Sequence, residues 1–281
     1  MTRVWLITGA SSGFGRAIAE AAVAAGDTVV GAARRTEALD DLVRAHPGQF
    51  EAVRLDVTSP EAPAVVDDVV DRHGRLDVLV NNAGRTQVGA LEETTAEELR
   101  YLFDLHFFGP AALTKAVLPH MRRQGGGAVV QMSSVGGQIT GPGFGAYCAT
   151  KFALEGLTQT LRQEVDFGVR FLIVEPGAFR TGLFDPGAAY LSQELPEYAD
   201  TVGPTRAYVT SGGGSQPGDP AKAAAAILTA LDTELPPLRL ALGGDAVDSI
   251  RAELDTRAAE LTAWEQTSRA TDFDKPAGQH L

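Results

Sequence analysis

The sequence predicts one α/β domain, in which a doubly wound parallel sheet is covered by helices on both faces. Short apolar runs recur along the chain and alternate with helical patterns, which is typical of repeated strand–helix units. The runs are continuously apolar rather than alternating, as expected for parallel strands buried on both faces. A glycine-rich turn joins the first run to the first helical pattern. We place this domain over residues 1–266 and expect a polar, fraying tail over residues 267–281.

Seven segments share the continuously apolar character of buried parallel strands. They follow one another at intervals that leave room for a helix or a loop between them. The predicted strands are Val4–Ile7, Thr28–Ala32, Gln49–Leu55, Leu76–Val80, Ala128–Met132, Val169–Val174 and Leu238–Leu242.

Three of the intervening helices have recognisable starts. Ser59-Pro60 predicts an N-cap followed by proline at the first helical position. Thr95 with Glu98 three residues later predicts a capping box. Asp219-Pro220 predicts the start of a helix over Ala221–Leu231.

Composition narrows the functional classes. The chain has 281 residues and a net charge of -12, which argues against a nucleic-acid partner because phosphate contacts need a basic face. The single cysteine, Cys148, excludes an internal disulfide and fits a reducing compartment. No apolar run approaches the length of a membrane span, and no signal-peptide layout follows Met1. We therefore expect a cytoplasmic protein without a membrane partner, and no metal site.

The stretch TGASSGFG, over residues 8–15, has two readings. One is GxSxG, the elbow that carries the nucleophile of serine hydrolases. Only one strand precedes Ser11, however, so no upstream loop is present to supply an oxyanion hole. The other is a glycine-rich loop that lets the backbone approach a dinucleotide pyrophosphate at a helix N-terminus, and we favour it. The residues expected to contact the cofactor here are Gly9, Ser11, Ser12, Gly13, Phe14 and Gly15.

The end of the second strand indicates which dinucleotide is bound. Folds that prefer NAD offer an acid there for the ribose hydroxyls. This strand ends with Arg34 and Arg35 instead. An arginine pairs with a 2′-phosphate through a forked, charge-assisted contact, so NADP(H) is the expected cofactor. The alternative is that both arginines are solvated charges at the start of a helix.

Tyr147 and Lys151 are four residues apart, so a helix places them on one face. Free tyrosine is a poor acid–base group because its pKa lies near 10, and a neighbouring ammonium is expected to lower that pKa. The pair then exchanges a proton with a substrate oxygen. Ser134 follows a predicted strand at the carboxyl edge of the sheet, where α/β sheets bind ligands. The alternatives are an ordinary exposed pair and a serine-rich turn.

Together these stretches resemble the short-chain dehydrogenase/reductase family, whose domain is Rossmann-like. The resemblance covers about residues 3–181 and depends on the order and spacing of five motifs. They are TGASSGFG (8–15), NNAG (81–84), Ser134 thirteen residues before Tyr147, YCATK (147–151) and PGAFRT (176–181).

The resemblance implies a role for each matched residue. Tyr147 is the general acid–base, Ser134 holds the substrate oxygen, and Lys151 lowers the pKa of Tyr147 and binds the nicotinamide ribose. Arg34 matches the position that selects the 2′-phosphate. Family members often form homodimers or homotetramers. Further cofactor contacts carried over from the family are Asp56 and Val57 at the adenine, Asn82, Ala83 and Gly84 on the adenosine side, and Pro176, Gly177 and Thr181 beside the nicotinamide.

His106 departs from the family pattern, which usually has asparagine at this place before the serine strand. In the family the main-chain carbonyl of this residue helps to hold a water that relays protons to the lysine. A backbone role survives the change, and a histidine can also titrate and relay protons itself. The alternative is a buried histidine satisfied by local hydrogen bonds. The other histidines, His46, His73, His120 and His280, match no motif and are expected at the surface.

The segment after Thr181 corresponds to the substrate lid of the family, and we place it at about residues 182–218. Within it, Thr201–Gly218 is rich in glycine, serine and proline and predicts a mobile loop. Its apolar residues suit a pocket for a bulky hydrophobic carbonyl or alcohol, or alternatively pack the lid onto the body. The expected pocket residues are Val135, Phe144, Gly182, Leu183, Phe184, Tyr190, Leu191, Leu195 and Tyr198.

The favoured function is therefore an NADP(H)-dependent oxidoreductase that interconverts a bulky hydrophobic ketone or aldehyde and its alcohol, in the reductive direction. A second hypothesis keeps the cofactor for redox-neutral chemistry such as epimerisation, elimination or cyclisation. A third is a cofactor-sensing binding protein, and a serine hydrolase is a distant fourth.

Overall fold

The protein is described by a computed structural model over residues 2–185, 187–211 and 213–273. Its centre is a seven-stranded sheet in the order β3-β2-β1-β4-β6-β7-β9, and every pairing in it is parallel. The strands are β1 (Val4–Thr8), β2 (Thr28–Ala33), β3 (Phe50–Arg54), β4 (Val78–Asn81), β6 (Gly127–Met132), β7 (Val169–Pro176) and β9 (Arg239–Leu242). The predicted fold class and all seven predicted strands are confirmed.

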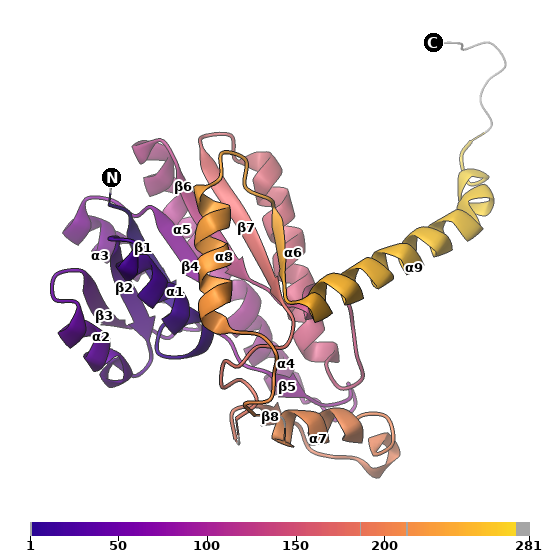
Figure 1. Cartoon of the computed structure of the whole chain (residues 1–281). Helices are drawn as coiled ribbons and strands as arrows, with labels where there is room; N and C mark the ends of the chain where they lie inside the picture. Colours follow the sequence, from indigo (N-terminus) through magenta and orange to yellow (C-terminus); the bar gives the residue numbers. More distant parts are fainter. Residues whose placement is uncertain (1, 186, 212, 274–281) are drawn as a thin grey trace, which may run out of the picture.

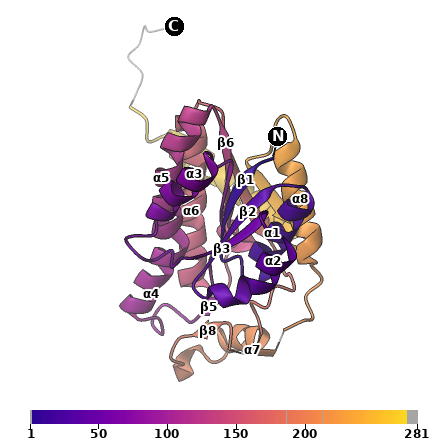
Figure 2. The ribbon, with the colours of Figure 1, turned by 90° about the vertical axis from the view of Figure 1, so that its left-hand side faces the viewer.

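Helices cover both faces of this sheet (Figures 1 and 2). One layer contains α1 (Gly13–Ala24), α2 (Asp40–Ala45) and α8 (Pro220–Asp232). The other contains α3 (Ala64–His73), α5 (Gly109–Gln124) and α6 (Gly145–Glu164), with α4 (Ala96–Phe103) at its end. This is the doubly wound arrangement that the sequence predicts.

Strand β1 shows why both faces are covered. Trp5 and Ile7 belong to the core cluster beneath α1 and α8, whereas Val4 and Leu6 belong to the cluster beneath α3 and α5. Successive side chains of a strand point to opposite faces of its sheet. The four consecutive apolar residues from Val4 to Ile7 therefore require a helical layer on each side.

Two predicted helix starts are confirmed. Thr95 accepts a hydrogen bond from the backbone of Glu98 (3.2 Å), and Glu98 accepts one from the backbone of Thr95 (3.0 Å), which completes the capping box. Asp219 accepts a hydrogen bond from the backbone of Ala221 (2.9 Å), and Pro220 is the first residue of α8.

The predicted start at Ser59-Pro60 is wrong, because α3 begins at Ala64. In a helix starting at Ser59, Pro63 would have to donate its N–H to the carbonyl of Ser59, and proline has no N–H. Turns therefore occupy residues 57–63. The backbone N–H of Thr58 donates to the Asp56 carboxylate (3.0 Å) within them.

The predicted mobile loop at Thr201–Gly218 is also wrong, because α7 spans Gly203–Ser211 within it. Val202 and Val209 are buried against Val88 in a small apolar cluster. Arg206 forms a buried ion pair with Glu93 (2.7 Å). This packing outweighs the low helix propensity of the surrounding glycines and serines.

Helix α7 belongs to a small unit at the carboxyl edge of the sheet. Here β5 (Gln87–Val88) pairs in parallel with β8 (Tyr190–Leu191). The two strands bring the chain after the NNAG motif beside the segment that follows Phe184. Neither strand is predicted from the sequence.

Helix α9 (Gly244–Arg269) was not predicted and extends away from the body of the protein (Figure 1). Every residue from 254 to 269 is exposed, so no apolar face signalled this helix in the sequence. The predicted tail at residues 267–281 is therefore wrong at its start, since residues 267–269 are helical. Its remainder from residue 274, which includes His280, lies outside the described residues, as do positions 1, 186 and 212.

Across the described ranges, no helix has both the length and the apolar character needed to cross a membrane. Among the same residues, no group of three or more His, Cys, Asp or Glu side chains is placed to hold a metal ion.

Candidate active site

The glycine-rich loop between β1 and α1 brings backbone segments into close contact. Gly13 has a φ of +55°, a conformation that residues with a Cβ rarely adopt. A Cβ on Gly15 would lie 2.3 Å from the Gly9 carbonyl oxygen, and a Cβ on Gly9 would lie 2.9 Å from the Cα of Ala83. The glycines are thus required by the shape of the loop, which leaves backbone open at the N-terminus of α1, where a pyrophosphate is best accommodated.

Thr8 and Asn82 hold this loop against the end of β4. The Thr8 hydroxyl accepts hydrogen bonds from the backbone N–H groups of Asn82 (2.9 Å) and Ala83 (3.0 Å). The Asn82 side chain donates to the carbonyls of Thr8 (2.8 Å) and Gly9 (3.2 Å). The side chain of Asn82 therefore shapes the cofactor loop. The role of Thr8 was missed, although its place before Gly9 at a strand end was a usable signal.

A cavity of about 840 Å³ runs along the carboxyl edge of the sheet. The structure brings all but one of the predicted catalytic and cofactor residues to its wall. The exception is Gly15, which packs against Gly9 behind the loop. The predicted residues in the wall are Gly9, Ser11, Ser12, Gly13, Phe14, Arg34, Arg35, Asp56, Val57, Asn82, Ala83, Gly84, His106, Ser134, Tyr147, Lys151, Pro176, Gly177 and Thr181.

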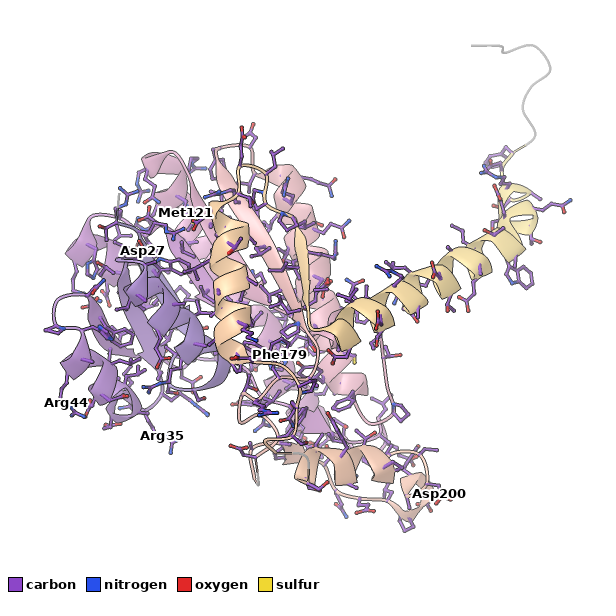
Figure 3. All side chains as sticks on the ribbon, viewed as in Figure 1. Asp27, Arg35, Arg44, Met121, Phe179 and Asp200 are labelled. Carbon is purple, nitrogen blue, oxygen red and sulfur yellow. The ribbon has the colours of Figure 1, made fainter. Side chains whose placement is uncertain are left out.

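Arg34 and Arg35 lie at one end of the cavity, and both side chains are exposed. Figure 3 shows Arg35 at the edge of the molecule. Asp56 lies nearby on the same wall, and its pKa is lowered mainly by a hydrogen bond from the backbone of Thr58, with a smaller effect of the Arg34 charge. An anion entering this end of the cavity meets two guanidinium groups that form no ion pair with a described carboxylate.

Ser134 and Tyr147 meet in the middle of the cavity wall. Ser134 lies two residues after the end of β6, and its hydroxyl accepts a hydrogen bond from the backbone of Gly136 (3.0 Å). Tyr147 lies in the first turn of α6, which carries its phenol toward Ser134. The ring packs edge-on against His106 (5.5 Å between centroids) and against Phe144 (6.3 Å).

The predicted direction of the Tyr147 pKa shift is wrong for this structure. Burial raises the pKa of Tyr147 to about 12, and this outweighs the opposite effect of the hydrogen bond with Ser134. Lys151 does not reverse the shift, because its ammonium is directed to the carbonyl of Met132 (2.8 Å) and lies 5.6 Å from the centre of the tyrosine ring. The phenol is therefore protonated at neutral pH, the state that a proton donor needs.

Lys151 is buried one helical turn after Tyr147. Burial lowers the pKa of Lys151 to about 8, and the negative charge of Glu155 acts in the opposite direction. The side chain is thus a cation at neutral pH with a pKa close enough to exchange protons.

His106 lies in a one-turn π-helical segment, Asp104–Phe108, between α4 and α5. Such irregular turns often mark functional sites. The backbone N–H of Arg85 donates to Nε2 (3.2 Å), which assigns the ring proton to Nδ1. Nδ1 then donates to the Thr150 hydroxyl (3.0 Å), which donates to the carbonyl of Tyr147 (2.7 Å). Burial, followed by the charges of Lys151 and Arg85, lowers the pKa of His106 well below 6.5.

A neutral ring with both nitrogens engaged favours a positioning role for His106 over proton transfer. We expect His106→Asn to leave the shape of the pH profile of kcat/KM unchanged, with a rate loss of less than about tenfold. A titrating relay would instead cost about 10²–10⁴-fold and would remove an ionisation near pH 6.5. Initial rates between about pH 5.5 and pH 9 distinguish the two roles.

Two buried carboxyl groups, Glu155 and Glu175, lie behind Lys151. The Ser133 hydroxyl donates to Glu155 (2.5 Å), and the side chain of Gln138 also bonds to it. Arg239 lies 3.3 Å from an oxygen of each acid. Burial and then the charge of Glu155 raise the pKa of Glu175 to about 8, and Arg239 acts in the opposite direction. At neutral pH one of the two acids therefore keeps its proton.

This pair predicts a pH-dependent stability. Because the pKa of Glu175 is higher in the folded than in the unfolded protein, its contribution to the free energy of unfolding falls as the pH rises from about 4.5 to about 8. We expect Glu175→Gln to raise the Tm by about 2–4 °C above pH 8 relative to wild type, and by less below pH 5. Glu234→Gln, at an exposed site, is the matched control. A Tm difference that is equal at both pH values would contradict this account.

Five of the nine predicted pocket residues line the substrate end of the cavity. Val135, Phe144, Gly182, Leu183 and Phe184 line it. The other four predicted pocket residues do not. Tyr190 and Leu191 form β8, and the Tyr198 hydroxyl donates to Glu92 (2.8 Å) in the small unit at the sheet edge. Leu195, the fourth of these residues, does not line the cavity either.

Three further residues of the cavity wall were missed. Phe179 packs against Phe14 (5.1 Å between ring centroids) near the foot of α8 (Figure 3). Asp245 accepts a hydrogen bond from the backbone of Ala178 (2.7 Å) and thereby holds the segment beside Gly177. Arg85 directly follows the NNAG motif. Arg85 and Asp245 belong to no motif, and Phe179 lies within PGAFRT without a role assigned from the sequence. Only the fold shows that the three residues face the site.

Several known proteins are similar to this chain in fold or sequence. A short-chain dehydrogenase structure from Streptomyces avermitilis is 67% identical, with a TM-score of 0.91 over 96% of this chain and 98% of that chain. Oxidoreductase BOA17 of Botryotinia fuckeliana is 36% identical over 96% of this chain and its own whole length. A 3-ketodihydrosphingosine reductase of Bacteroides thetaiotaomicron is 38% identical over 71% of this chain and 72% of its own.

Cofactor complexes occur among the more distant structures. An alcohol dehydrogenase of Thermococcus sibiricus, complexed with 5-hydroxy-NADP, is 26% identical, with a TM-score of 0.70 over 86% of this chain and 96% of that chain. A Burkholderia phymatum member in complex with NAD is also 26% identical, with a TM-score of 0.79 over 93% and 95% of the two chains. The family model described as short chain dehydrogenase matches residues 3–189. This chain therefore belongs to the short-chain dehydrogenase family of oxidoreductases.

Proposed function

We propose that the protein is an NADP(H)-dependent reductase of bulky hydrophobic ketones or aldehydes. The observation that carries this proposal is that Ser134 and Tyr147 lie in one cavity with the glycine-rich loop and with an apolar substrate end. The residues present fit a dinucleotide, because the glycine-rich loop lies in the cavity wall at the N-terminus of α1 and two exposed arginines lie in the same wall. In this proposal the loop holds the pyrophosphate and Arg34 and Arg35 the 2′-phosphate, while Lys151 and the segment from Pro176 to Thr181 hold the nicotinamide end.

The cofactor supplies a hydride to the carbonyl carbon when it is bound. Ser134 donates a hydrogen bond to the carbonyl oxygen and orients the substrate. Tyr147 donates its phenolic proton to the same oxygen as negative charge develops there. The raised pKa of Tyr147 keeps this proton in place until an acceptor stronger than water arrives. Lys151, with a pKa lowered to about 8, remains cationic at neutral pH and favours the phenolate that results.

The proposed substrate class follows from the apolar residues that line the cavity at its substrate end. Val135, Phe144, Leu183 and Phe184 are apolar or aromatic and line the same cavity, and Phe144 packs against Tyr147. Few polar groups in an apolar wall suit a large hydrophobic molecule held at one polar point. The name of one relative, 3-ketodihydrosphingosine reductase, describes the reduction of a ketone, which agrees with the proposed reaction.

The function is tested by the loss of reduced-nicotinamide absorbance with purified protein and a panel of bulky ketones and aldehydes. NADPH and NADH are compared at equal concentration. We expect turnover with NADPH at a rate well above that with NADH. Absence of turnover over the whole panel with both cofactors, from a protein that binds NADPH, would contradict the proposed reductase and favour redox-neutral chemistry.

A further inference from the structure

Arg85 is a cation of the active-site cavity that the proposed reaction does not use. It lies between the NNAG motif and β5, and its backbone N–H binds the ring of His106, which packs on Tyr147. The guanidinium carbon lies 4.6 Å from the ring centre of Tyr101 in α4 and 4.5 Å from that of Tyr190 in β8. Two aromatic rings therefore pack on the guanidinium by cation–π contact, which involves its plane and leaves the N–H groups at its edge for polar contacts.

That edge has no acceptor among the described residues. The Nε atom of Arg85 is buried without a hydrogen-bond partner. No described carboxylate lies within ion-pair distance of the guanidinium. A buried donor left without a hydrogen-bond partner destabilises the folded protein, and more strongly when it is charged. An anionic ligand at this edge would remove that destabilisation.

The nearby acid, Glu98, is already engaged. Its carboxylate accepts hydrogen bonds from the hydroxyl of Tyr190 (2.7 Å), the hydroxyl of Ser192 (2.9 Å) and the backbone of Thr95 (3.0 Å). These bonds hold the ring of Tyr190 and the start of α4, the helix that carries Tyr101. They therefore fix the positions of the two rings that pack on Arg85. Against the effect of burial, the hydrogen bond from Tyr190 and, to a smaller extent, the charge of Arg85 lower the pKa of Glu98. The two side chains form no ion pair, so the guanidinium keeps N–H groups without an acceptor among the described residues.

The charge of the cavity wall also favours an anionic ligand. The chain carries a net charge of -12. Among the described residues, however, the cavity wall contains four cations, Arg34, Arg35, Arg85 and Lys151, against two acids, Asp56 and Asp245. In the proposed function three of the cations serve the cofactor. Arg85, beside His106 and Tyr147, is left for the substrate, and a local positive potential in an acidic protein favours an anionic ligand.

We propose that Arg85 binds a carboxylate of the substrate, so that the substrate is a hydrophobic keto acid or hydroxy acid. The carbonyl or hydroxyl group lies at Ser134 and Tyr147, the apolar body lies along Phe144 and Phe184, and the carboxylate pairs with the guanidinium edge. A planar, pre-oriented fork suits a carboxylate, which accepts two parallel N–H bonds. The inference rests on the proposed function and adds the charge of the substrate to it.

The test measures binding, so that it does not depend on turnover. Calorimetry with the NADP⁺-loaded enzyme gives the Kd of three keto acids with increasing spacer length: 4-acetylbenzoate, (4-acetylphenyl)acetate and 3-(4-acetylphenyl)propanoate. The methyl ester of each is measured in parallel. We expect the wild type to bind at least one acid about 10–100-fold more tightly than its ester, which corresponds to a charge-assisted hydrogen bond of about 1.5–3 kcal/mol. In Arg85→Gln the ratio of the two Kd values should fall to about one.

Arg100→Gln is the matched control, since Arg100 is an exposed arginine of α4 outside the cavity wall, and it should keep the wild-type ratio. The proposal is overturned if every ester binds as tightly as its acid in the wild type. It is also overturned if Arg85→Gln weakens acid and ester equally, because Arg85 then only ties Tyr190 to α4. Failure of the reductase itself is distinguished by the neutral ketone panel, in which no carboxylate takes part.

Discussion

Tyr147→Phe is expected to lower kcat by at least about 10²–10⁴-fold while the Kd for NADPH changes by less than about threefold. The variant loses the only proton that the phenol offers to the carbonyl oxygen, and it keeps the ring that packs against His106 and Phe144. Single-turnover rates with saturating ketone, together with NADPH fluorescence titrations, measure the two quantities separately.

The matched control is Tyr208→Phe, because Tyr208 also lines the cavity but is half exposed at 48%. It should retain most of the activity. A Tyr147→Phe enzyme that kept most of its turnover would show that another group protonates the substrate. An equal loss of NADPH binding would show that Tyr147 acts through the cofactor site instead.

Arg34→Gln is expected to lower the ratio of kcat/KM for NADPH to that for NADH by about 10–100-fold, mainly through the KM for NADPH. The reason is the loss of a charge-assisted contact with the 2′-phosphate, a group that NADH lacks. Arg35→Gln apportions the effect between the two arginines at this end of the cavity. The comparison is made at fixed ionic strength, since exposed charges are screened by salt.

Arg44→Gln is the control, because Arg44 is an exposed arginine of α2 that does not line the cavity. Figure 3 shows it at the edge of the molecule. It should leave the ratio unchanged. A wild-type preference for NADH, or a ratio that both Arg34→Gln and Arg35→Gln leave intact, would overturn the assignment of NADP(H).

The sheet was predictable mainly because its inner strands, such as β1 and β4, are buried on both faces and are therefore almost entirely apolar. The elements that were missed lack that signal. Helix α9 has almost no buried residue, and α7 is stabilised by the buried pair of Arg206 and Glu93, which lie far apart in the sequence. The start of α3 was misplaced because Ser59-Pro60 is a good helix start locally, and only Pro63 prevents it.

In the candidate site, too, some features were predictable from the sequence and others only from the folded structure. Motifs located Ser134, Tyr147, Lys151 and the glycine loop, since their spacing alone brings them to one edge of the sheet. The pKa of Tyr147 was not predictable, because its direction is decided by burial among residues from several elements. Arg85 was missed because its proposed role depends on two tyrosines that approach it only in the folded chain.

The most direct test of the proposed reaction is isotope transfer from NADPH deuterated at the transferable position of the nicotinamide. The wild-type enzyme is incubated with a ketone from the panel, and the product alcohol is examined by mass spectrometry and NMR. Hydride transfer to a carbonyl held by Ser134 and Tyr147 predicts one deuterium on the carbinol carbon for each NADPH consumed. A product that forms without deuterium and without consumption of NADPH would contradict the reductase and establish redox-neutral chemistry in its place.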